Sequence, residues 1–517
     1  MDTRKAFPLY LFLLTVLLFF SGLGARDFWA PVEPRYAEIA RVMFVKDEWI
    51  LPTVNGDLYT DKPILYFWLV LLASKVAGTV NEWTVRLPAA LGGIGTVLAT
   101  YFIGRDFFSA RIGFLGAVIL ATCMRMIWEA RWAHIDALFC FFFSLSVYFG
   151  GRALLRQGNP NEILAAYMFM ALAVLAKGFI GVVLPALLFI AFVLARHDWS
   201  MIGVAKLHLG IPIFFCIALP WFFLVNQATD GKWLADFTYI HHFQRYTAGL
   251  GHRQPFYYYF MTLPVDFLPW TVFALAGLFA QRGWRWVWAE PIPQFFLLWF
   301  AVVFFFFSLS DTKRDLYLMP LLPPLALFVG YYFDALADGG LPQDRFYRWT
   351  GAGYFALVAA TGLATPAVAR VFRPDASSAI LPASLVLAVG GVCTAWFIWR
   401  SRPLAALASA STMMAVSLLA ASLSVFPYLE RFKSPRLFSQ EVKKLVSPAT
   451  PLFIYADTMH DFNYYLEREV IPILRSPPEV DALLARGRHG YMLVKERDLK
   501  RVPSLALERV VLSSDDS

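Results

Sequence analysis

Long apolar segments recur along most of this 517-residue chain, and they constrain its fold more than any other feature. Each has roughly 17 to 22 residues, the length of a helix that crosses a bilayer. With 59% hydrophobic and only 16% charged residues, the chain is not an ordinary soluble enzyme. We predict an α-helical polytopic membrane protein with about 13 transmembrane helices. The predicted spans begin near Phe7, Trp83, Ile112, Asp136, Ile163, Phe179, Leu207, Thr262, Pro293, Leu316, Gly351, Ala379 and Leu404.

The first apolar segment has two interpretations, a signal peptide or a retained span. Arg4 and Lys5 precede it, but no small-x-small cleavage site stands before Arg26, so we favour a retained span. Basic pairs in alternate loops then predict a cytoplasmic N-terminus and a C-terminus outside. The net charge of +8 mainly reflects these pairs, so we expect no nucleic-acid partner. The pairs are Arg4/Lys5, Arg105/Arg111, Arg152/Arg156, Arg196/Lys206, Arg282/Arg285, Arg345/Arg348 and Arg400/Arg402.

The composition changes near Tyr428, where charged residues appear and the long apolar segments stop. We predict a transmembrane domain over residues 1–427 and a small periplasmic α/β domain over 428–517. A lid or packing role is favoured for this second domain over catalysis. Its predicted strands are Pro451–Ala456 and Gly490–Lys495, and its predicted helices are Ser439–Val446 and Pro478–Arg486.

Two long loops are predicted on the outer side, over about 25–82 and 226–261. The first contains two amphipathic stretches, Arg35–Val45 and Ile64–Ala77, which we expect to form helices at the membrane interface. Large outer loops that frame a membrane cavity are where a lipid-facing enzyme keeps its site.

Ionisable residues gather near this outer boundary, where their cost in an apolar environment makes a functional reading the default. Carboxylates and histidines can abstract a proton, and cations can bind phosphate, so together they outline a reaction site. The group comprises Glu33, Arg35, Asp61, Lys62, Arg131, His134, Asp136, Lys177, His241, His242, Arg245, Lys313, Arg314 and Tyr317.

Simpler roles remain open for several of these residues. Lysines and arginines near span ends often extend to the interface without binding anything. Asp136 precedes an apolar run and can be a helix cap. A metal site at Asp61, His241 and His242 is possible, but adjacent histidines point in different directions and no second ligand spacing supports it.

An ordered series of motifs resembles the bacterial branch of the GT-C membrane glycosyltransferases, which includes the aminoarabinose lipid A transferases and relatives of the protein O-mannosyltransferases. The series covers nearly the whole chain. It consists of Glu33–Arg41, Asp47–Ile50, Asn55-Gly56, Tyr59–Pro63, Asn81–Trp83, Arg86–Pro88, Lys177-Gly178, His242–Arg245, Thr312–Arg314, Tyr317 and Pro320.

The resemblance implies inverting transfer of a sugar from a polyprenyl phosphate, typically undecaprenyl phosphate, to a periplasmic acceptor such as lipid A, lipopolysaccharide or another envelope glycan. It further implies an inner-membrane enzyme, expected to be a monomer in contact with membrane lipids. No cofactor is certain, although a divalent cation is possible. A protein O-mannosyltransferase-like activity is the first alternative. A lipid-linked-sugar flippase is the second, and the lack of an internal repeat argues against it.

The resemblance also assigns roles to individual residues. Glu33, Asp61 and Asp136 are the candidate catalytic acids. The resemblance implies that Lys62 and Arg245 hold the phosphate and that Arg314 and Tyr317 line the carrier site. With the polar residues near the outer boundary, the full set of candidate substrate contacts is Arg35, Tyr36, Tyr59, Lys62, Arg131, Lys177, His242, Arg245, Lys313, Arg314 and Tyr317.

The chain departs from the family pattern at three of these positions. Relatives usually carry an acidic pair before Pro-Arg-Tyr, whereas Val32 replaces the first acid here and leaves Glu33 alone. Asp61 and His241 also replace glutamates that are usual in the family. These changes leave open which carboxylate serves as the base.

Overall fold

The computed structural model describes residues 3–156, 158–247, 252–274, 289–339, 346–485 and 490–499. It forms two compact units. The first unit comprises Met1–Leu23, Thr60–Tyr66 and Arg86–Tyr428, and the second comprises Gly24–Tyr59, Phe67–Val85 and Leu429–Ser517. The predicted domain boundary near 428 falls at the last of these junctions. Most of the first outer loop, however, belongs to the second unit and not to the helical domain.

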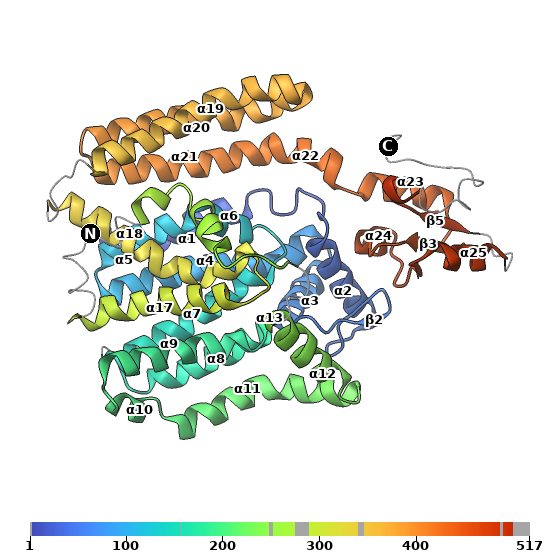
Figure 1. The fold of residues 1–517 in the computed structure, drawn as a ribbon, viewed down its shortest axis with the longest axis horizontal. Coiled ribbons are helices and arrows are strands. Elements are labelled where there is room, and N and C mark those ends of the chain that lie inside the picture. Colours follow the sequence, from blue (N-terminus) through green and yellow to red (C-terminus); the bar gives the residue numbers. More distant parts are fainter. Residues whose placement is uncertain are drawn as a thin grey trace. The chain divides into compact units, whose positions relative to one another are not determined.

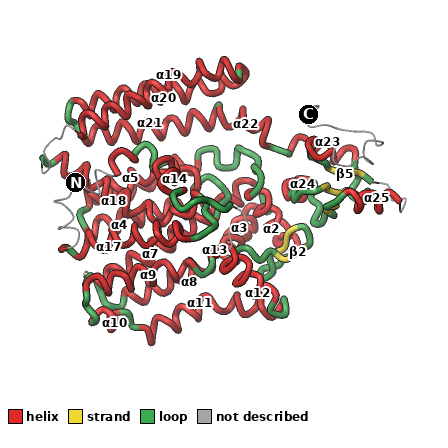
Figure 2. The backbone as a smooth tube through the Cα atoms, in the orientation of Figure 1, coloured by secondary structure: helices red, strands yellow, loops and turns green. Residues whose placement is uncertain are grey.

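Helices dominate the first unit (Figures 1 and 2). Among the described residues, eight helical segments are long and apolar enough to cross a membrane. The polytopic α-helical class is therefore confirmed, while the total of about 13 spans stays a prediction. The eight are α4 (Glu82–Phe107), α7 (Ile135–Leu154), α11 (Leu207–Ala228), α17 (Pro291–Leu309), η3 with α18 (Asp315–Leu321 and Leu322–Ala337), α19 (Ala352–Phe372, counted from Tyr347), α20 (Ser377–Trp399, counted from Pro374) and α21 (Pro403–Leu423).

Shorter helices complete the first unit. They are α1 (Phe7–Phe20), α5 (Ala110–Ala121), α6 (Met124–Glu129), α8 (Glu162–Lys177), α9 (Ile180–Arg196), α10 (Ser200–Val204), α12 (Lys232–Thr238), η2 (Tyr239–Gln244), α13 (Arg245–Thr247) and α14 (Tyr258–Asp266). Four of them, α1, α5, α8 and α9, begin close to predicted spans.

The long helices differ in how much of their surface is covered by protein. The apolar window of η3 and α18 is 89% buried, whereas that of α19 is 17% buried. Helices α19, α20 and α21 lie side by side (Figure 1), and α19 exposes large side chains such as Leu363 and Val371. We conclude that α18 is central and that α19 has the exposed apolar surface of a lipid-facing helix.

Glycines allow the central helices to approach closely. A Cβ added to Gly330 of α18 would lie 2.7 Å from the backbone nitrogen of Gly116 in α5, a distance that real Cβ atoms do not show. Small residues at such crossings are typical of membrane helices, which gain stability from close packing.

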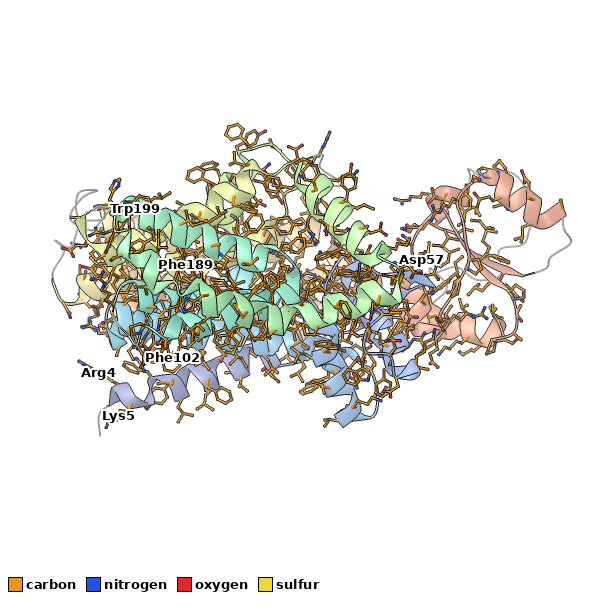
Figure 3. The ribbon with its side chains drawn as sticks, turned by 90° about the horizontal axis from the view of Figure 1, so that it is seen from below. Arg4, Lys5, Asp57, Phe102, Phe189 and Trp199 are labelled. Carbon is orange, nitrogen blue, oxygen red and sulfur yellow. The ribbon has the colours of Figure 1, made fainter. Side chains whose placement is uncertain are left out.

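One end of the first unit carries Arg4, Lys5 and Trp199 together, where Trp199 directly precedes α10 (Figure 3). Arg152, which belongs to another of the predicted cytoplasmic basic pairs, binds Asp106 and Glu162. This grouping agrees with the predicted topology, and the side of the membrane that it faces stays a prediction. Arg282, Arg285 and Arg345 lie outside the described residues.

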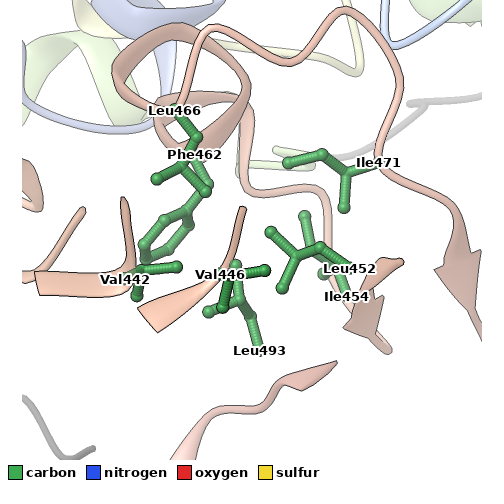
Figure 4. Packing of buried hydrophobic residues seen from close by; sticks show 8 residues of the cluster. All are labelled: Val442, Val446, Leu452, Ile454, Phe462, Leu466, Ile471 and Leu493. Carbon is green, nitrogen blue, oxygen red and sulfur yellow. The ribbon is translucent and has the colours of Figure 1, made fainter. Parts of the chain in front are cut away.

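The second unit contains a small parallel sheet ordered β4-β3-β5, as the predicted α/β class requires. Leu452 and Ile454 of β3 pack with Val442 and Phe462 in its hydrophobic core (Figure 4). Strand β4 and helix α24 were not predicted. The C-terminal elements are α22 (Val425–Lys433), which begins in the first unit, α23 (Arg436–Leu445), β3 (Leu452–Tyr455), α24 (His460–Tyr465), β4 (Ile473–Leu474), α25 (Pro477–Ala485), β5 (Tyr491–Leu493) and α26 (Glu496–Leu499).

The first outer loop supplies the rest of the second unit. The two predicted interfacial helices are present as α2 (Val32–Lys46) and α3 (Leu65–Ala77), of which α3 begins in the first unit. Between them lie the paired strands β1 (Thr53–Val54) and β2 (Asp57–Leu58). Helix α2 packs on α24, so the loop and the C-terminal segment share one unit.

Candidate active site

Asp61 lies at the centre of one charged group, which joins the segment before α3 to η2 and α13. Its Oδ1 atom accepts hydrogen bonds from Lys62 Nζ at 2.8 Å and from Arg245 Nη1 at 2.6 Å. His241 Nδ1 lies 3.4 Å from the same oxygen, and His241 Nε2 lies 3.0 Å from Thr60 Oγ1. Residues about 180 positions apart in the sequence are thus held together around one carboxylate.

The charges in this group determine its protonation. Burial alone would raise the pKa of the Asp61 carboxyl, but Lys62 and Arg245 hold that pKa well below its usual range. Burial lowers the pKa of Lys62, and the neighbouring Asp61 opposes this change. Burial likewise lowers the pKa of His241, which favours its neutral form. Asp61 is therefore an ionised partner of two cations.

A second pair, Asp136 and Lys177, joins the start of α7 to the end of α8. Both residues are buried, and Lys177 Nζ donates a hydrogen bond to Asp136 Oδ1. The ammonium group also lies 5.0 Å from the ring centroid of Phe139 and 4.9 Å from that of Tyr317. The cap residue of α7 is His134, so Asp136 lies within the helix as an ion-pair partner instead of serving as its cap.

Tyr317, in η3, connects the two carboxylate groups. It lies within electrostatic range of Asp61 and Asp136, and of the guanidinium groups of Arg245 and Arg314. The like charges of Lys62 and Lys177 repel each other, and the Arg314 guanidinium attracts the Asp136 carboxylate. The structure thereby brings together eight of the predicted side chains: Asp61, Lys62, Asp136, Lys177, His241, Arg245, Arg314 and Tyr317.

We call Lys62, Lys177, Arg245 and Arg314, with Asp61 and Asp136, the cation site. Four cations set against two carboxylates leave two positive charges in excess among these side chains. A local excess of positive charge attracts anions, so the site favours binding of an anion. Lysines and arginines suit a phosphate in particular.

His242 packs differently from its neighbour His241. Its Nδ1 lies 2.8 Å from the carbonyl oxygen of Phe237, and burial lowers its pKa to about 4, so the ring is neutral near pH 7. The ring also lies against Gly178, the residue after Lys177. His242 thus anchors η2 beside the junction of α8 and α9, and its predicted contact with phosphate stays a prediction.

Gly178→Ala should disturb this anchor. Gly178 has a φ of +97°, and an added Cβ would lie 2.7 Å from His242 Nε2, so the change strains the backbone and displaces the ring. Because η2 carries His241 and leads into Arg245, we expect weaker phosphate binding and about tenfold lower turnover. Titration with undecaprenyl phosphate and steady-state kinetics measure both effects. Gly203→Ala, whose Cβ would meet no atom within 4 Å, is the matched control, and equal effects of the two changes would contradict the expectation.

Two predicted cations make other contacts. Arg131 Nη2 donates to the Ser21 carbonyl oxygen and to Ser422 Oγ, which joins the ends of α1 and α21. Lys313 Nζ donates to the carbonyl oxygens of Gln254 and Ser310 and holds the loop before η3. Both contacts support the fold, and the predicted substrate roles of these residues stay predictions.

The remaining predicted residues belong to the second unit. Tyr36 and Tyr59 pack edge-on to each other with their ring centroids 6.4 Å apart, and both contact Phe67. Arg35, near the start of α2, has a buried Nε without a hydrogen-bond partner among the described residues.

Glu33 is fully buried and held by several hydrogen bonds. Its oxygens accept from Arg26 Nη1 at 2.7 Å and Nη2 at 3.1 Å, and one of them also accepts from the Trp29 backbone nitrogen at 3.1 Å. Such a bidentate pair fixes the start of α2. These hydrogen bonds give Glu33 a structural role. Glu33 is therefore a poor replacement for the family's first acid, whose position Val32 occupies.

Glu33→Gln is expected to reduce stability more than chemistry. The change leaves the Arg26 guanidinium buried without its anion, which costs about 3 kcal/mol. We expect a lower melting temperature, with the turnover of the folded fraction within about twofold of the wild type. Thermal unfolding and active-site titration separate the two quantities. Full stability combined with lost turnover would instead make Glu33 the base.

The predicted metal ligands do not form a suitable site. His242 turns its Nδ1 to the Phe237 carbonyl, and Asp61 Oδ1 is already bound by two cations. In the part of the chain that the structure describes, no group of three or more His, Cys, Asp or Glu side chains is placed to hold a metal ion. The donor set at Asp61, His241 and His242 thus does not fit a divalent cation.

Comparison with known proteins places the chain among membrane glycosyltransferases. Residues 61–223 match the dolichyl-phosphate-mannose-protein mannosyltransferase family. The chain is 24% identical over 487 residues, 90% of its length and 86% of the relative, to the undecaprenyl phosphate-alpha-4-amino-4-deoxy-L-arabinose arabinosyl transferase of Shewanella sediminis.

Solved structures share the fold. Superposition on ArnT from Cupriavidus metallidurans bound to undecaprenyl phosphate gives a TM-score of 0.81 at 22% identity, with 99% of this chain and 97% of that one covered. The archaeal oligosaccharyltransferase AglB from Archaeoglobus fulgidus gives 0.55 at 12% identity, with coverages of 97% and 70%. The flippase alternative has no support among these relatives, which are named as transferases. The family match, the curated relative and the shared fold together support an enzyme, a membrane glycosyltransferase of the GT-C type.

Proposed function

We propose that the protein transfers a sugar, with inversion, from undecaprenyl phosphate to a lipid A or lipopolysaccharide acceptor. The observation that carries this proposal is the cation site, in which Lys62, Lys177, Arg245 and Arg314 exceed the carboxylates by two charges. The Shewanella sediminis transferase, which is named for undecaprenyl phosphate, and the solved ArnT structure, which has undecaprenyl phosphate bound, support the same carrier.

The charge balance of the reaction fits this site. The acceptor oxygen forms a bond to the anomeric carbon while the bond from that carbon to the phosphate oxygen breaks. The electron pair stays on the phosphate, which changes from a diester with one negative charge to a monoester with two. Two excess positive charges stabilise the leaving group more than the bound donor, which is the condition for acceleration.

The Asp136–Lys177 pair can supply the base that removes the proton of the acceptor hydroxyl. When the donor phosphate draws the Lys177 ammonium towards itself, Asp136 loses its partner and can accept a proton from an acceptor hydroxyl. Glu33 is held by Arg26, and Asp61 is held by two cations, so Asp136 is the described carboxylate best suited to act as the base.

The proposal also includes the cellular location and the membrane orientation of the enzyme. It is an inner-membrane protein with a cytoplasmic N-terminus, and its site and C-terminal domain lie on the periplasmic side. The basic residues at one end of the first unit support this orientation.

Mass spectrometry of lipid A and envelope glycans, from cells with and without the protein, tests the acceptor. We expect a lipid A species with one added sugar that disappears when the protein is absent. An unchanged lipid A, together with a lost glycopeptide, would instead favour the protein O-mannosyltransferase-like activity that the match over residues 61–223 suggests.

A further inference from the structure

A second group of charged side chains surrounds Arg125 of α6. Arg125 Nη1 lies 3.0 Å from Glu129 Oε1, its Nη2 lies 2.5 Å from Asp266 Oδ1, and the same Nη2 binds Asp315 Oδ2. Glu129 uses its second oxygen to contact His134 Nδ1 at 2.7 Å. We call these five residues the arginine network. The sequence reading did not single out Arg125, Glu129 or Asp266.

The network is buried except at Asp315, and it depends on the shape of the arginine. Glu129 is fully buried, Asp266 is 5% exposed, and the Arg125 side chain is 11% exposed. A guanidinium can bind carboxylates in three directions at once, which an ammonium on a flexible stem does with less geometric definition. Two buried carboxylates and a third, more exposed one around a single cation are expensive to maintain, and Asp266 Oδ2 has no hydrogen-bond partner among the described residues. Stability alone accounts poorly for this arrangement.

The two ends of the network lie next to the cation site. His134 is the cap residue of α7 and stands two positions before Asp136. Asp315 directly follows Arg314 and stands two positions before Tyr317. Arg125 therefore links the segment that carries the candidate base to the segment that carries Arg314 and Tyr317.

The phosphate cations Lys62 and Arg245 come from other elements. Lys62 precedes α3, and Arg245 begins α13. The network thus touches the segments that carry Asp136 and Arg314, whereas two of the four phosphate cations, Lys62 and Arg245, lie on separate parts of the chain.

We propose that the arginine network is a positioning device, which sets the distance between the start of α7 and η3 so that Asp136 and Arg314 act on the same reacting group. This proposal rests on the glycosyltransferase function proposed above. Errors of about 1 Å in such positions lower turnover by about 100-fold. A positioning role affects kcat more than affinity for the carrier, because two of the four phosphate cations, Lys62 and Arg245, lie on elements that the network does not contain.

Four variants of the full-length protein test the proposal: Arg125→Gln, Arg125→Lys, Glu129→Gln and Asp266→Asn. We expect Arg125→Gln to lower kcat about 100-fold, with affinity for undecaprenyl phosphate within about threefold of the wild type. Arg125→Lys should recover part of kcat. Glu129→Gln should lower kcat more than Asp266→Asn, because Glu129 contacts His134, the cap residue of the helix that carries Asp136.

Arg152→Gln is the matched control. Arg152 is also the centre of an ion-pair group, with Asp106 and Glu162, and it lies at the opposite end of α7 from Asp136. We expect it to leave the kcat of the folded enzyme unchanged. If Arg125→Gln fails to fold, Arg125→Lys and Glu129→Gln give the same comparison.

Two results would overturn the proposal. One is a kcat within twofold of the wild type for folded Arg125→Gln and Glu129→Gln. The other is a parallel loss of carrier affinity and kcat in all four variants, which indicates general damage to the fold. Failure of the proposed function looks different, because the wild-type protein itself would then transfer no sugar.

Discussion

Lys62→Met is expected to lower turnover of the lipid-linked sugar by about 10²- to 10³-fold, and Arg245→Gln by a similar factor. Each change removes one of the cations that face the phosphate, and loss of a preorganised charge contact of this kind costs about 3 to 4 kcal/mol in the transition state. Both residues bind Asp61, so either change also leaves that carboxylate with one partner fewer.

Steady-state kinetics and titration with undecaprenyl phosphate measure this effect. Lys232→Met is the control. Lys232 lies in the same outer loop as Arg245, is exposed, and pairs with Asp236 on α12. We expect this control to match the wild type. If Lys62→Met and Arg245→Gln retain wild-type turnover while folded, the cation site is not the phosphate site.

The second large effect is expected at the Asp136–Lys177 pair. Asp136→Asn leaves the Lys177 ammonium buried beside Phe139 and Tyr317 without its anion. Removing one partner of a buried ion pair costs about 3 to 5 kcal/mol of stability. We expect a lower melting temperature and a loss of turnover by at least about 100-fold.

A double variant separates stability from chemistry in this pair. Asp136→Asn with Lys177→Met removes both charges, and replacement of a buried pair by uncharged groups is often close to neutral for stability. We therefore expect the melting temperature to recover while turnover stays low. Recovery of both quantities would show that the pair is structural.

Hydropathy predicted the helices of the first unit well. Spans expected near Trp83, Asp136, Leu207 and Pro293 correspond to α4, α7, α11 and α17, because a bilayer requires long apolar segments whatever their packing. Strand β3 of the small sheet was also predicted, because it is buried along its whole length and therefore reads as a short apolar run. Strand β4 has only two residues, which is too short for a periodic pattern.

The candidate site was predicted by residue type better than by contact. Lys177 and Lys313 are similar in sequence as polar residues in apolar surroundings, yet Lys177 binds Asp136 whereas Lys313 binds backbone carbonyl groups. Only the packing of α7, α8 and η3 separates the two cases. Glu33 shows the same limit of prediction, because its partner Arg26 belongs to none of the sequence motifs.

Arg125 and Glu129 were missed although a local signal was present. They are four positions apart on a short helix, a spacing typical of an ion pair on a helix surface. That spacing alone predicts an exposed pair. The distant partners Asp266 and Asp315 extend the pair into a network that is buried at Asp266, and they are more than 130 positions away in the sequence.

Turnover by the purified protein tests the central claim most directly. The protein in lipid nanodiscs is supplied with an undecaprenyl-phosphate-linked amino sugar and with lipid A, and released undecaprenyl phosphate and glycosylated lipid A are measured together. We expect the two products in equal amounts, with inverted anomeric configuration, and a loss of both in Lys62→Met. Tight binding of undecaprenyl phosphate without any sugar transfer, or transfer that persists in Lys62→Met, would contradict the account.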